Sequence, residues 1–463
     1  MENVKSPWLS RAGLALANWS ERWFPDPLIF AFIGIVVVFL IGLATGERPS
    51  TMAIQGGKSF WALIPFTMQM VMIIVGGYVV ASSAPVGKII DRIARIPNTP
   101  RTAVALVALV AMLAGLLSWG FSLICGGFLV RRLAYRIPGM DYRAAGAAGY
   151  LGNGVVWSLG LSSSAAMFMA TRTSIPPVLF NISGLIPLTQ TIFLWQSMVM
   201  ALVLMCGGLF IAYRSVPSPD RAKTVHDFHL PPDAAPVMEP RSKPGEWLEY
   251  SPILTIAIVA ALLTYLIDVF RTSPQGALAA LDLNPYNLMF ITAGLLLHWK
   301  PKRFMRAVSE CIPATGGVLI QFPFYAMIFG MITNTGLSAK AAHLFASVTT
   351  HETYALLVAA YSALLGLFIP SGGSKWVVEA PYVMQAAITN KVHLGWVVQI
   401  YNASEALPGM INPFFMLPLL GILKIRARDL VGFTALYLVV QVPIVFFFCW
   451  LFSQTIPFAG VVK

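Results

Sequence analysis

Long apolar runs alternate with short polar segments along almost the whole chain. The uninterrupted runs are 28–44, 61–81, 193–213, 253–269, 287–299, 312–334 and 431–452. A helix of roughly 20 apolar residues is long enough to cross a bilayer. These runs therefore predict transmembrane helices. They disfavour a transmembrane barrel, whose strands alternate polar and apolar residues.

Other apolar stretches are interrupted in the middle. Stretches 102–130 and 354–388 contain a polar or glycine-rich dip, and stretches 144–171 and 394–423 are broken by Gly, Ser, Asn and Pro. Irregular backbone at membrane depth is tolerated only where it is buried in protein or lines a cavity. We therefore expect the functional residues in these interruptions.

A polar segment, 214–250, rich in Pro and charge, separates two apolar halves. We interpret it as a cytoplasmic linker. The predicted organisation is an interfacial N-terminal arm (1–27), a first membrane half (28–213), the linker, and a second membrane half (251–463).

The two halves share an order of features that indicates an internal repeat, over 60–213 and 311–452. Gln69 and Gln321 each start an apolar run, and each run is followed by an interrupted stretch, centred near Trp119 in the first half and near Pro370 in the second. A broken helix then follows in each half, with its break near Ser163 or Asn412. Inverted repeats with paired discontinuous helices are typical of secondary transporters.

Composition agrees with a membrane protein. Of 463 residues, 57% are apolar and 11% are charged, against about 25% charged residues in soluble domains. The net charge of +12 lies largely in basic clusters at 88–101, 131–143, 300–306 and 424–428. A cytoplasmic position for these clusters explains the charge without a nucleic-acid partner. It also predicts an N-terminus inside and a C-terminus outside.

The basic clusters also constrain the interrupted stretches. Arg101 and Arg131 flank stretch 102–130, and one stretch of this length cannot cross twice when each crossing needs roughly 20 residues. We expect a re-entrant hairpin here and a matching one in the second half. The predicted fold is an all-α polytopic membrane protein with two inverted repeats, about nine transmembrane helices and two re-entrant hairpins.

Candidate substrate-binding residues lie at the hairpin tips and helix breaks. A helix N-terminus offers unpaired N–H groups and a partial positive charge, which suit an anion. The alternative is that Gly and Ser only allow close helix packing, or that the hydroxyls bond carbonyls of their own helix. The candidates are Ser118, Gly120, Ser122, Asn153, Ser162, Ser163, Ser164, Ser371, Gly372, Gly373, Ser374, Lys375 and Asn412.

A coupling ion has its own candidates: Asn153, Ser163, Glu379, Glu405 and Asn412. Carbonyls at the breaks suit Na⁺, and buried carboxylates suit H⁺. Lys375 and Glu379 lie four residues apart on one helical face, so Lys375 either faces a substrate carboxylate or neutralises Glu379. No cofactor or metal site is predicted, because the four Cys show no metal-ligand spacing.

Several short stretches carry a family resemblance, at 26–30, 82–85, 184–187, 287–298, 321–326 and 370–381. In these the chain resembles the bacterial short-chain fatty acid transporters (acetoacetate/butyrate permeases) of the ion transporter superfamily. The resemblance implies uptake of a short monocarboxylate across the bacterial cytoplasmic (inner) membrane. It also implies a scaffold and a mobile transport domain, moving as an elevator in a homodimer.

The resulting hypothesis is secondary active transport of a small monocarboxylate, coupled to H⁺ or Na⁺. One alternative keeps the fold and changes the substrate to a dicarboxylate or an inorganic anion, and another is an anion channel. We do not expect an enzyme, because the apolar segments contain no HExxH or paired-Asp motif.

Overall fold

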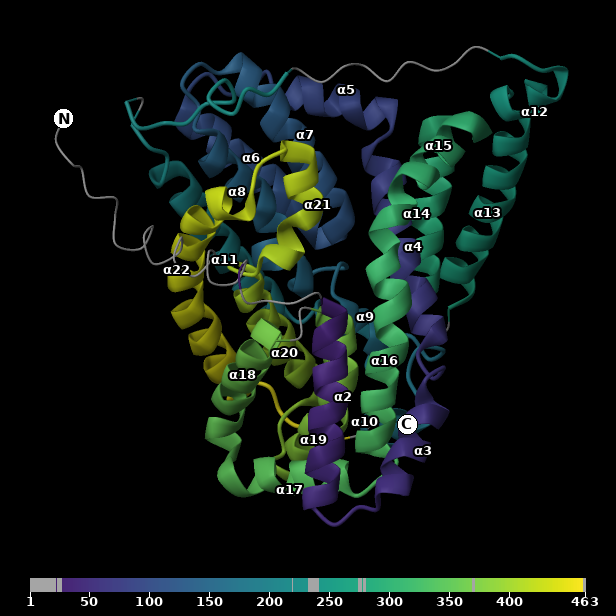
Figure 1. The fold of residues 1–463 in the computed structure, drawn as a ribbon, viewed down its shortest axis with the longest axis vertical. Helices are drawn as coiled ribbons and strands as arrows, with labels where there is room; N and C mark the ends of the chain where they lie inside the picture. The colour runs from purple at the N-terminus through teal and green to yellow at the C-terminus, as the bar shows by residue number, and fades with distance from the viewer. Residues whose placement is uncertain are drawn as a thin grey trace.

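The computed structural model describes residues 22, 27–218, 220–231, 241–273, 277, 280–368 and 371–460. Its regular elements are helices (Figure 1), which confirms the predicted all-α class. The predicted interfacial arm lies outside the described residues, apart from Arg22 and Pro27.

Helices occupy the predicted apolar runs in the first half. They are α2 (Pro27–Ala44), α3 (Pro49–Ser59), α4 (Ile64–Ala81), α5 (Ala84–Ile93), α6 (Pro100–Leu117), α7 (Trp119–Arg136), α8 (Tyr142–Leu151), α9 (Ser164–Ala170), α10 (Pro177–Ser183) and α11 (Trp195–Arg214).

The second half continues the pattern after the linker. Its helices are α12 (Trp247–Tyr250), α13 (Ile253–Thr272), α14 (Leu283–His298), α15 (Pro301–Cys311), α16 (Gly316–Thr333), α17 (Leu337–Val348), α18 (His351–Phe368), α19 (Gly372–Thr389), α20 (Leu394–Gly409), α21 (Pro413–Leu423) and α22 (Ala427–Ser453).

Six helical segments in the described residues are long and apolar enough to cross a membrane. They include α4, α6, α11, α16 and α22, and a segment ending with α13. Helices α2 and α13 expose rows of large apolar side chains, among them Val36, Leu40, Ile256 and Ile267. Such surfaces suit contact with lipid rather than water.

Each interrupted stretch forms a pair of helices. In the first half α6 and α7 pack against each other and are joined by Ser118 alone. In the second half α18 ends at Phe368 and α19 begins at Gly372. The residue expected at the tip of this second turn, Pro370, lies outside the described residues.

The broken stretches differ in the form of their break. In the first, α8 runs into a π-helical turn at Gly152–Val156 and a 3₁₀ turn at Trp157–Leu159 before α9 begins. In the second, α20 ends at Gly409 and α21 begins at Pro413. The first break is therefore longer than a single interruption near Ser163, because the π-helical and 3₁₀ turns both precede it.

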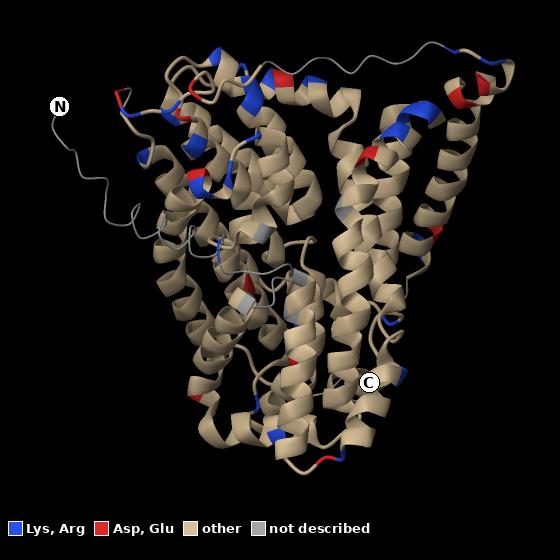
Figure 2. Ribbon diagram, in the orientation of Figure 1, with Lys and Arg blue, Asp and Glu red and all other residues tan. Residues whose placement is uncertain are grey.

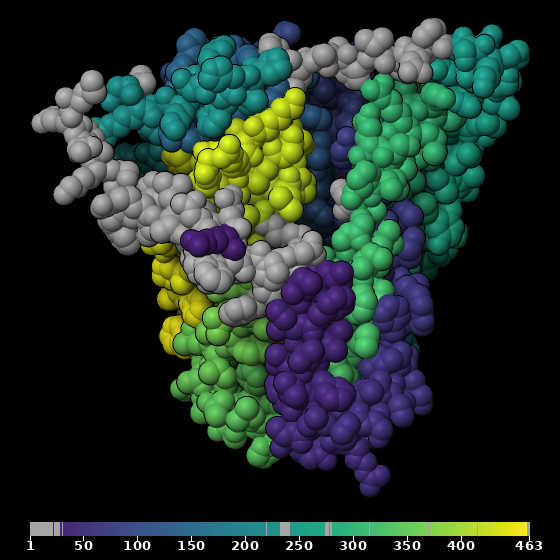
Figure 3. All heavy atoms as spheres, viewed as in Figure 1, coloured from purple at the N-terminus to yellow at the C-terminus, as the bar shows by residue number. Residues whose placement is uncertain are grey.

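Charged residues divide the molecule into two ends. Figure 2 shows Lys and Arg gathered at the end that carries α5, α15 and the linker, with fewer at the end that carries α3 and α17. Between these ends, the face seen in Figure 3 is hollowed beside α21, at its border with α14–α16. This placement agrees with the basic clusters marked in the sequence.

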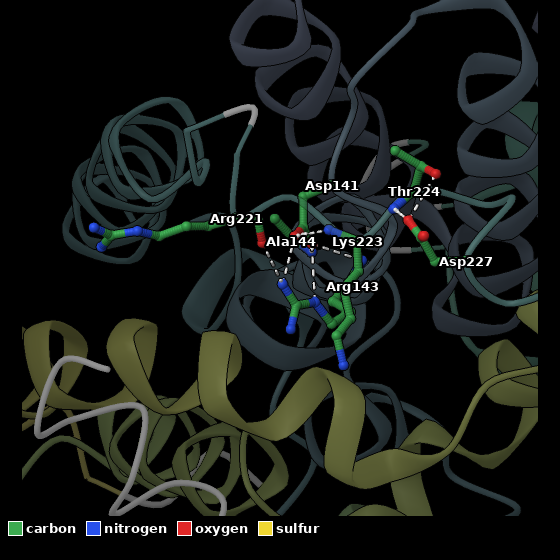
Figure 4. A network of polar contacts seen from close by, with 7 residues as sticks. All are labelled: Asp141, Arg143, Ala144, Arg221, Lys223, Thr224 and Asp227. Atoms are coloured by element: carbon green, nitrogen blue, oxygen red, sulfur yellow. Dashed lines mark hydrogen bonds and ion pairs between the residues drawn. The ribbon is translucent and has the colours of Figure 1, made fainter. Parts of the chain in front are cut away.

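The first part of the linker is docked rather than extended in solvent. Asp141 accepts hydrogen bonds from the backbone N–H of Lys223 (3.0 Å) and from the side chain of Arg143 (2.6 Å) (Figure 4). Within the linker, the backbone N–H of Thr224 donates to Asp227 and holds the pKa of that carboxyl below its ordinary value. Val225 is fully buried. Residues 220–231 therefore form part of the packed structure around α7 and α8.

Close backbone contact joins the first break to the first helix pair. A Cβ placed on Gly152 would lie 2.1 Å from the carbonyl oxygen of Ala111 and 2.0 Å from Oγ of Ser122. Ser122 itself donates to the carbonyl of Ala111 at 2.7 Å. Only a residue without a side chain fits between these atoms.

We predict that Gly152→Ala destabilises the folded protein, because the added methyl group overlaps α6 backbone. Overpacking of this kind costs about 1–3 kcal/mol. Thermal unfolding followed by size-exclusion chromatography would measure the loss.

The matched control is Gly421→Ala in α21, where an added Cβ meets no atom within 4 Å. This variant should unfold at or slightly above the wild-type temperature, since Ala favours a helix over Gly. Equal stability of the two variants would contradict the packing described for Gly152.

Candidate substrate site

Three serine hydroxyls cap the helices that begin at the interruptions. Ser118 caps α7, Ser163 caps α9 and Ser371 caps α19. Their Oγ atoms accept from the N–H groups of Phe121 (3.4 Å), Ala166 (3.1 Å) and Ser374 (3.4 Å). Each cap satisfies one of the N–H groups that a helix start leaves unpaired.

The first helix pair meets the first break directly. The backbone N–H of Trp119, the first residue of α7, donates to Oγ of Ser162. Ser162 is 1% exposed and Ser118 is fully buried. The start of α7 is thus held against the segment that leads into α9.

The second helix pair reaches the same break. A Cβ on Gly372 would lie 2.4 Å from the ring of Trp157, and a Cβ on Gly373 would lie 3.3 Å from Cβ of Ser164. Phe66 of α4 approaches Gly373 as well, at 2.9 Å from the same built position. The start of α19 therefore packs against the break between α8 and α9.

The second break joins the first through α8 and α20. The hydroxyl of Tyr150 donates to the carbonyl of Gly409 at 2.8 Å, and α20 packs against the π-helical turn that contains Asn153. Asn412 is 4% exposed and directly precedes α21. The structure thus brings candidate residues of both halves into one buried region.

Other candidates serve packing or a different network. Ser122 bonds the carbonyl of Ala111 in α6, and a Cβ placed on Gly120 would lie 3.9 Å from the backbone of Ile73 in α4. The amide of Gln69 donates to Asn284 at 2.8 Å and accepts from Ser174 at 2.6 Å. Gln321 is buried in α16.

Lys375 does not stand alone beside the capped helix start. It is fully buried and pairs with Glu405 and with Glu379, whose Oε1 lies 3.5 Å from Nζ. It also donates to the carbonyl of Ser362 in α18. The expected i,i+4 contact with Glu379 is present, and Glu405 of α20 completes a cluster of one ammonium and two carboxylates.

Sequence reasoning did not single out Ser362 or Tyr401. Ser362 donates to Glu379 at 2.6 Å. Tyr401 donates to the carbonyl of Gly372 at 2.6 Å, and its ring lies 4.8 Å from Nζ of Lys375. The sequence offered only a weak indication of Tyr401, which is its position four residues before Glu405, on the same face of α20.

Comparison with known proteins decides the family. The model of the family described as "Short chain fatty acid transporter" matches residues 8–452. The chain belongs to the short-chain fatty acid transporter family. Since this is a family of transporters, the chain is a transporter and not an enzyme, as expected from its sequence.

Two relatives of this transporter carry the same name, "Putative short-chain fatty acid transporter". The relative from Escherichia coli (strain K12) is 36% identical over 436 residues, covering 92% of this chain and 96% of the relative. The relative from Haemophilus influenzae is 31% identical over 443 residues, covering 94% of this chain and 98% of the relative. The resemblance stated from the short motifs is thereby confirmed.

Solved structures share the fold of this transporter. The Alcanivorax borkumensis YdaH transporter matches with a TM-score of 0.59 at 15% identity, covering 93% of this chain and 98% of that chain. Neisseria gonorrhoeae MtrF matches with a TM-score of 0.52 at 14% identity, covering 97% and 98%. These likenesses concern the fold alone. Together with the six candidate spans in the described residues, they agree with a multi-pass membrane protein.

We predict that Lys375→Met strongly destabilises this transporter. The change leaves two carboxylates buried without their cation, and breaking a buried pair costs about 3–5 kcal/mol. The yield of monodisperse protein and its unfolding temperature would report the loss. A second change in the same chain, Glu405→Gln, should recover part of it.

The matched control is Lys340→Met, which removes an exposed lysine lying 3.8 Å from Glu47. Exposed pairs contribute about 0–1 kcal/mol, so this variant should behave like the wild type. A Lys375→Met protein as stable as Lys340→Met would refute the buried cluster.

Proposed function

We propose that this chain is a secondary active transporter of short-chain monocarboxylates, of the acetate, butyrate and acetoacetate type, coupled to H⁺ or Na⁺. The family and the names of the relatives support the substrate class. The observation that carries the proposal is the meeting of the serine-capped starts of α7 and α19 at the break before α9.

The substrate carboxylate binds at these helix starts. After capping, each start still has backbone N–H groups without an intrahelical acceptor, and the helix dipole adds partial positive charge. The proposed binding residues are those named from the sequence other than Gly120, Ser122 and Lys375, with Ser118, Ser162, Ser371 and Gly372 at the centre. Because Gly372 has no Cβ, the ring of Trp157 packs directly against this helix start.

The short apolar tail packs on aromatic side chains. Phe66 and Trp157 both contact the first turn of α19, and Trp157 is 8% exposed. An apolar wall beside an anion site favours a fatty acid over an inorganic anion, which has no tail to bury. It also disfavours a dicarboxylate, whose second charge would be desolvated there.

The two halves form inverted repeats, and the α6–α7 and α18–α19 pairs are re-entrant, with about nine crossings elsewhere. The basic end faces the cytoplasm of a bacterium, with the N-terminus inside and the C-terminus outside. A transport domain that contains the helix pairs moves against a scaffold, as an elevator in a homodimer. The domain bounds are those expected from the sequence.

Transport into proteoliposomes tests this function. Labelled acetate, butyrate, acetoacetate and succinate are supplied under an imposed proton gradient, then under an imposed Na⁺ gradient, with protein-free liposomes subtracted for passive entry of the neutral acid. We expect accumulation of the monocarboxylates under one of the gradients. No accumulation under either gradient overturns the proposal, and rapid uncoupled flux indicates a channel.

We predict that Ser371→Ala weakens butyrate uptake while the protein stays folded. The hydroxyl caps α19 at the proposed carboxylate site. Loss of one hydrogen bond to the substrate costs about 1 kcal/mol, which corresponds to roughly a fivefold rise in the apparent KM. Asn412→Ala, at the second break, should also reduce uptake. Initial uptake rates across butyrate concentrations measure both effects.

The control is Ser347→Ala, since Ser347 is an exposed serine whose hydroxyl bonds the carbonyl of Leu344 within α17. It should leave KM unchanged. Wild-type uptake by both Ser371→Ala and Asn412→Ala would refute the site.

A further inference from the structure

One ammonium and two carboxylates are enclosed between α18, α19 and α20. Lys375 and Glu379 are fully buried, and Glu405 is 1% exposed. Glu405 forms the closer pair with Lys375, while Oε1 of Glu379 lies 3.5 Å from Nζ. With all three groups ionised, this cluster carries one uncompensated negative charge.

Among the described residues, the neighbouring groups do not supply a second cation. The titratable side chains beside the carboxylates are Tyr354 and Tyr361 on α18, Tyr382 on α19 and Tyr401 on α20. Tyr354 donates to the carbonyl of Val383, and Tyr361 and Tyr382 bond each other at 2.8 Å. Phenols of this kind are neutral at ordinary pH. The charged residues of α22, which packs on α18 and α20, are confined to its first turn, at Arg428 and Asp429.

We propose that Glu379 and Glu405 together hold the proton that is coupled to substrate transport. This inference rests on the proposed function and narrows its coupling ion to H⁺. An unpaired carboxylate at membrane depth costs several kcal/mol, and a proton on the pair removes that charge. The two carboxylates share Lys375, so the proton belongs to the pair and not to one oxygen.

A sodium ion fits this cluster poorly. Lys375 already forms an ion pair with each of the two carboxylates, and it donates a hydrogen bond to the carbonyl of Ser362. A second cation would have to sit beside the ammonium, where like charges repel strongly in a low dielectric. A proton needs no such space, because it becomes part of the carboxyl group.

The cluster lies directly behind the proposed substrate site. Lys375 follows Gly372 by three residues, a rise of about 4.5 Å along the helix. Tyr401 connects them, since its hydroxyl bonds the carbonyl of Gly372 and its ring faces Lys375. A negative cluster at this position repels a substrate carboxylate, and a neutral one does not.

Proton and substrate binding therefore strengthen each other. By linkage, if protonation tightens carboxylate binding, then carboxylate binding raises the proton affinity by the same factor. The carboxylate and one proton enter together on one side and leave together on the other. The net charge moved is zero for a monocarboxylate.

Equilibrium binding to the full chain in lipid nanodiscs tests this proposal. Labelled butyrate is titrated at pH 6, 7 and 8, with K⁺ or Na⁺ as the salt, and butyrate stays ionised throughout. For the wild type we expect Kd to rise up to tenfold per pH unit, the limit for one linked proton, with no effect of Na⁺. The variants Glu379→Gln and Glu405→Gln carry neutral side chains that mimic the protonated pair. Each should bind at pH 8 about as tightly as the wild type at pH 6.

The control, Glu352→Gln, alters an exposed glutamate at the start of α18 and should keep the wild-type pH dependence. If the wild-type Kd does not change with pH, or if it is lower in Na⁺ than in K⁺, the proton assignment is overturned while the proposed function stands. The proton assignment is also overturned if Kd depends on pH in both Gln variants as it does in the wild type. Absence of butyrate binding by the wild type at every pH overturns the proposed function instead.

Proton uptake provides a second measurement if the Gln variants do not fold. Butyrate is added to wild-type protein in weakly buffered solution, and the pH change is recorded with an indicator dye. We expect up to one proton taken up for each butyrate bound, with the value largest near the midpoint of the pH dependence. Binding without any proton uptake across pH 6 to 8 refutes the proposal.

Discussion

Every backbone N–H at membrane depth needs an acceptor within the protein, because lipid offers none. This transporter starts α7, α9 and α19 in its buried interior, where each start leaves several N–H groups without an intrahelical partner. The hydroxyls of Ser118, Ser163 and Ser371 satisfy part of that need, and Ser162 takes one more N–H from Trp119. The packing of the two halves around these helix starts follows from the same requirement.

Close packing around the helix starts demands small residues. Gly152 lies against the backbone of α6, and Gly372 lies against the ring of Trp157. Residues that read as helix breakers in a linear sequence are thus the points where separate elements touch. The same glycines that interrupt the apolar runs allow the interruptions to be buried.

Ion pairs at the surface and in the interior of this transporter differ in how much water screens them. Surface pairs such as Arg132 with Asp91 are 41% and 48% exposed, so water screens them and they add little stability. The cluster of Lys375, Glu379 and Glu405 has no such screening, and its protonation state matters to any anion bound nearby. The ion pair between Asp141 and Arg143, beside the docked linker, is intermediate in exposure, because Asp141 is buried and the Arg143 side chain is 21% exposed.

The sequence by itself determined where the long apolar helices form, because apolar length is a local property, whereas short helices such as α3, α5 and α15 lay outside the predicted runs. The run 193–213 became α11 (Trp195–Arg214), and Lys375 was matched with Glu379 because four residues make one helical turn. Contacts between distant segments could not be predicted in this way. Repeat spacing marked Gln69 as a polar position of interest, yet it bonds Asn284 and Ser174, neither of which was named from the sequence. Only the tertiary structure placed Glu405 beside Lys375 and Ser162 beside Trp119, since these contacts depend on how separate helices pack within each half.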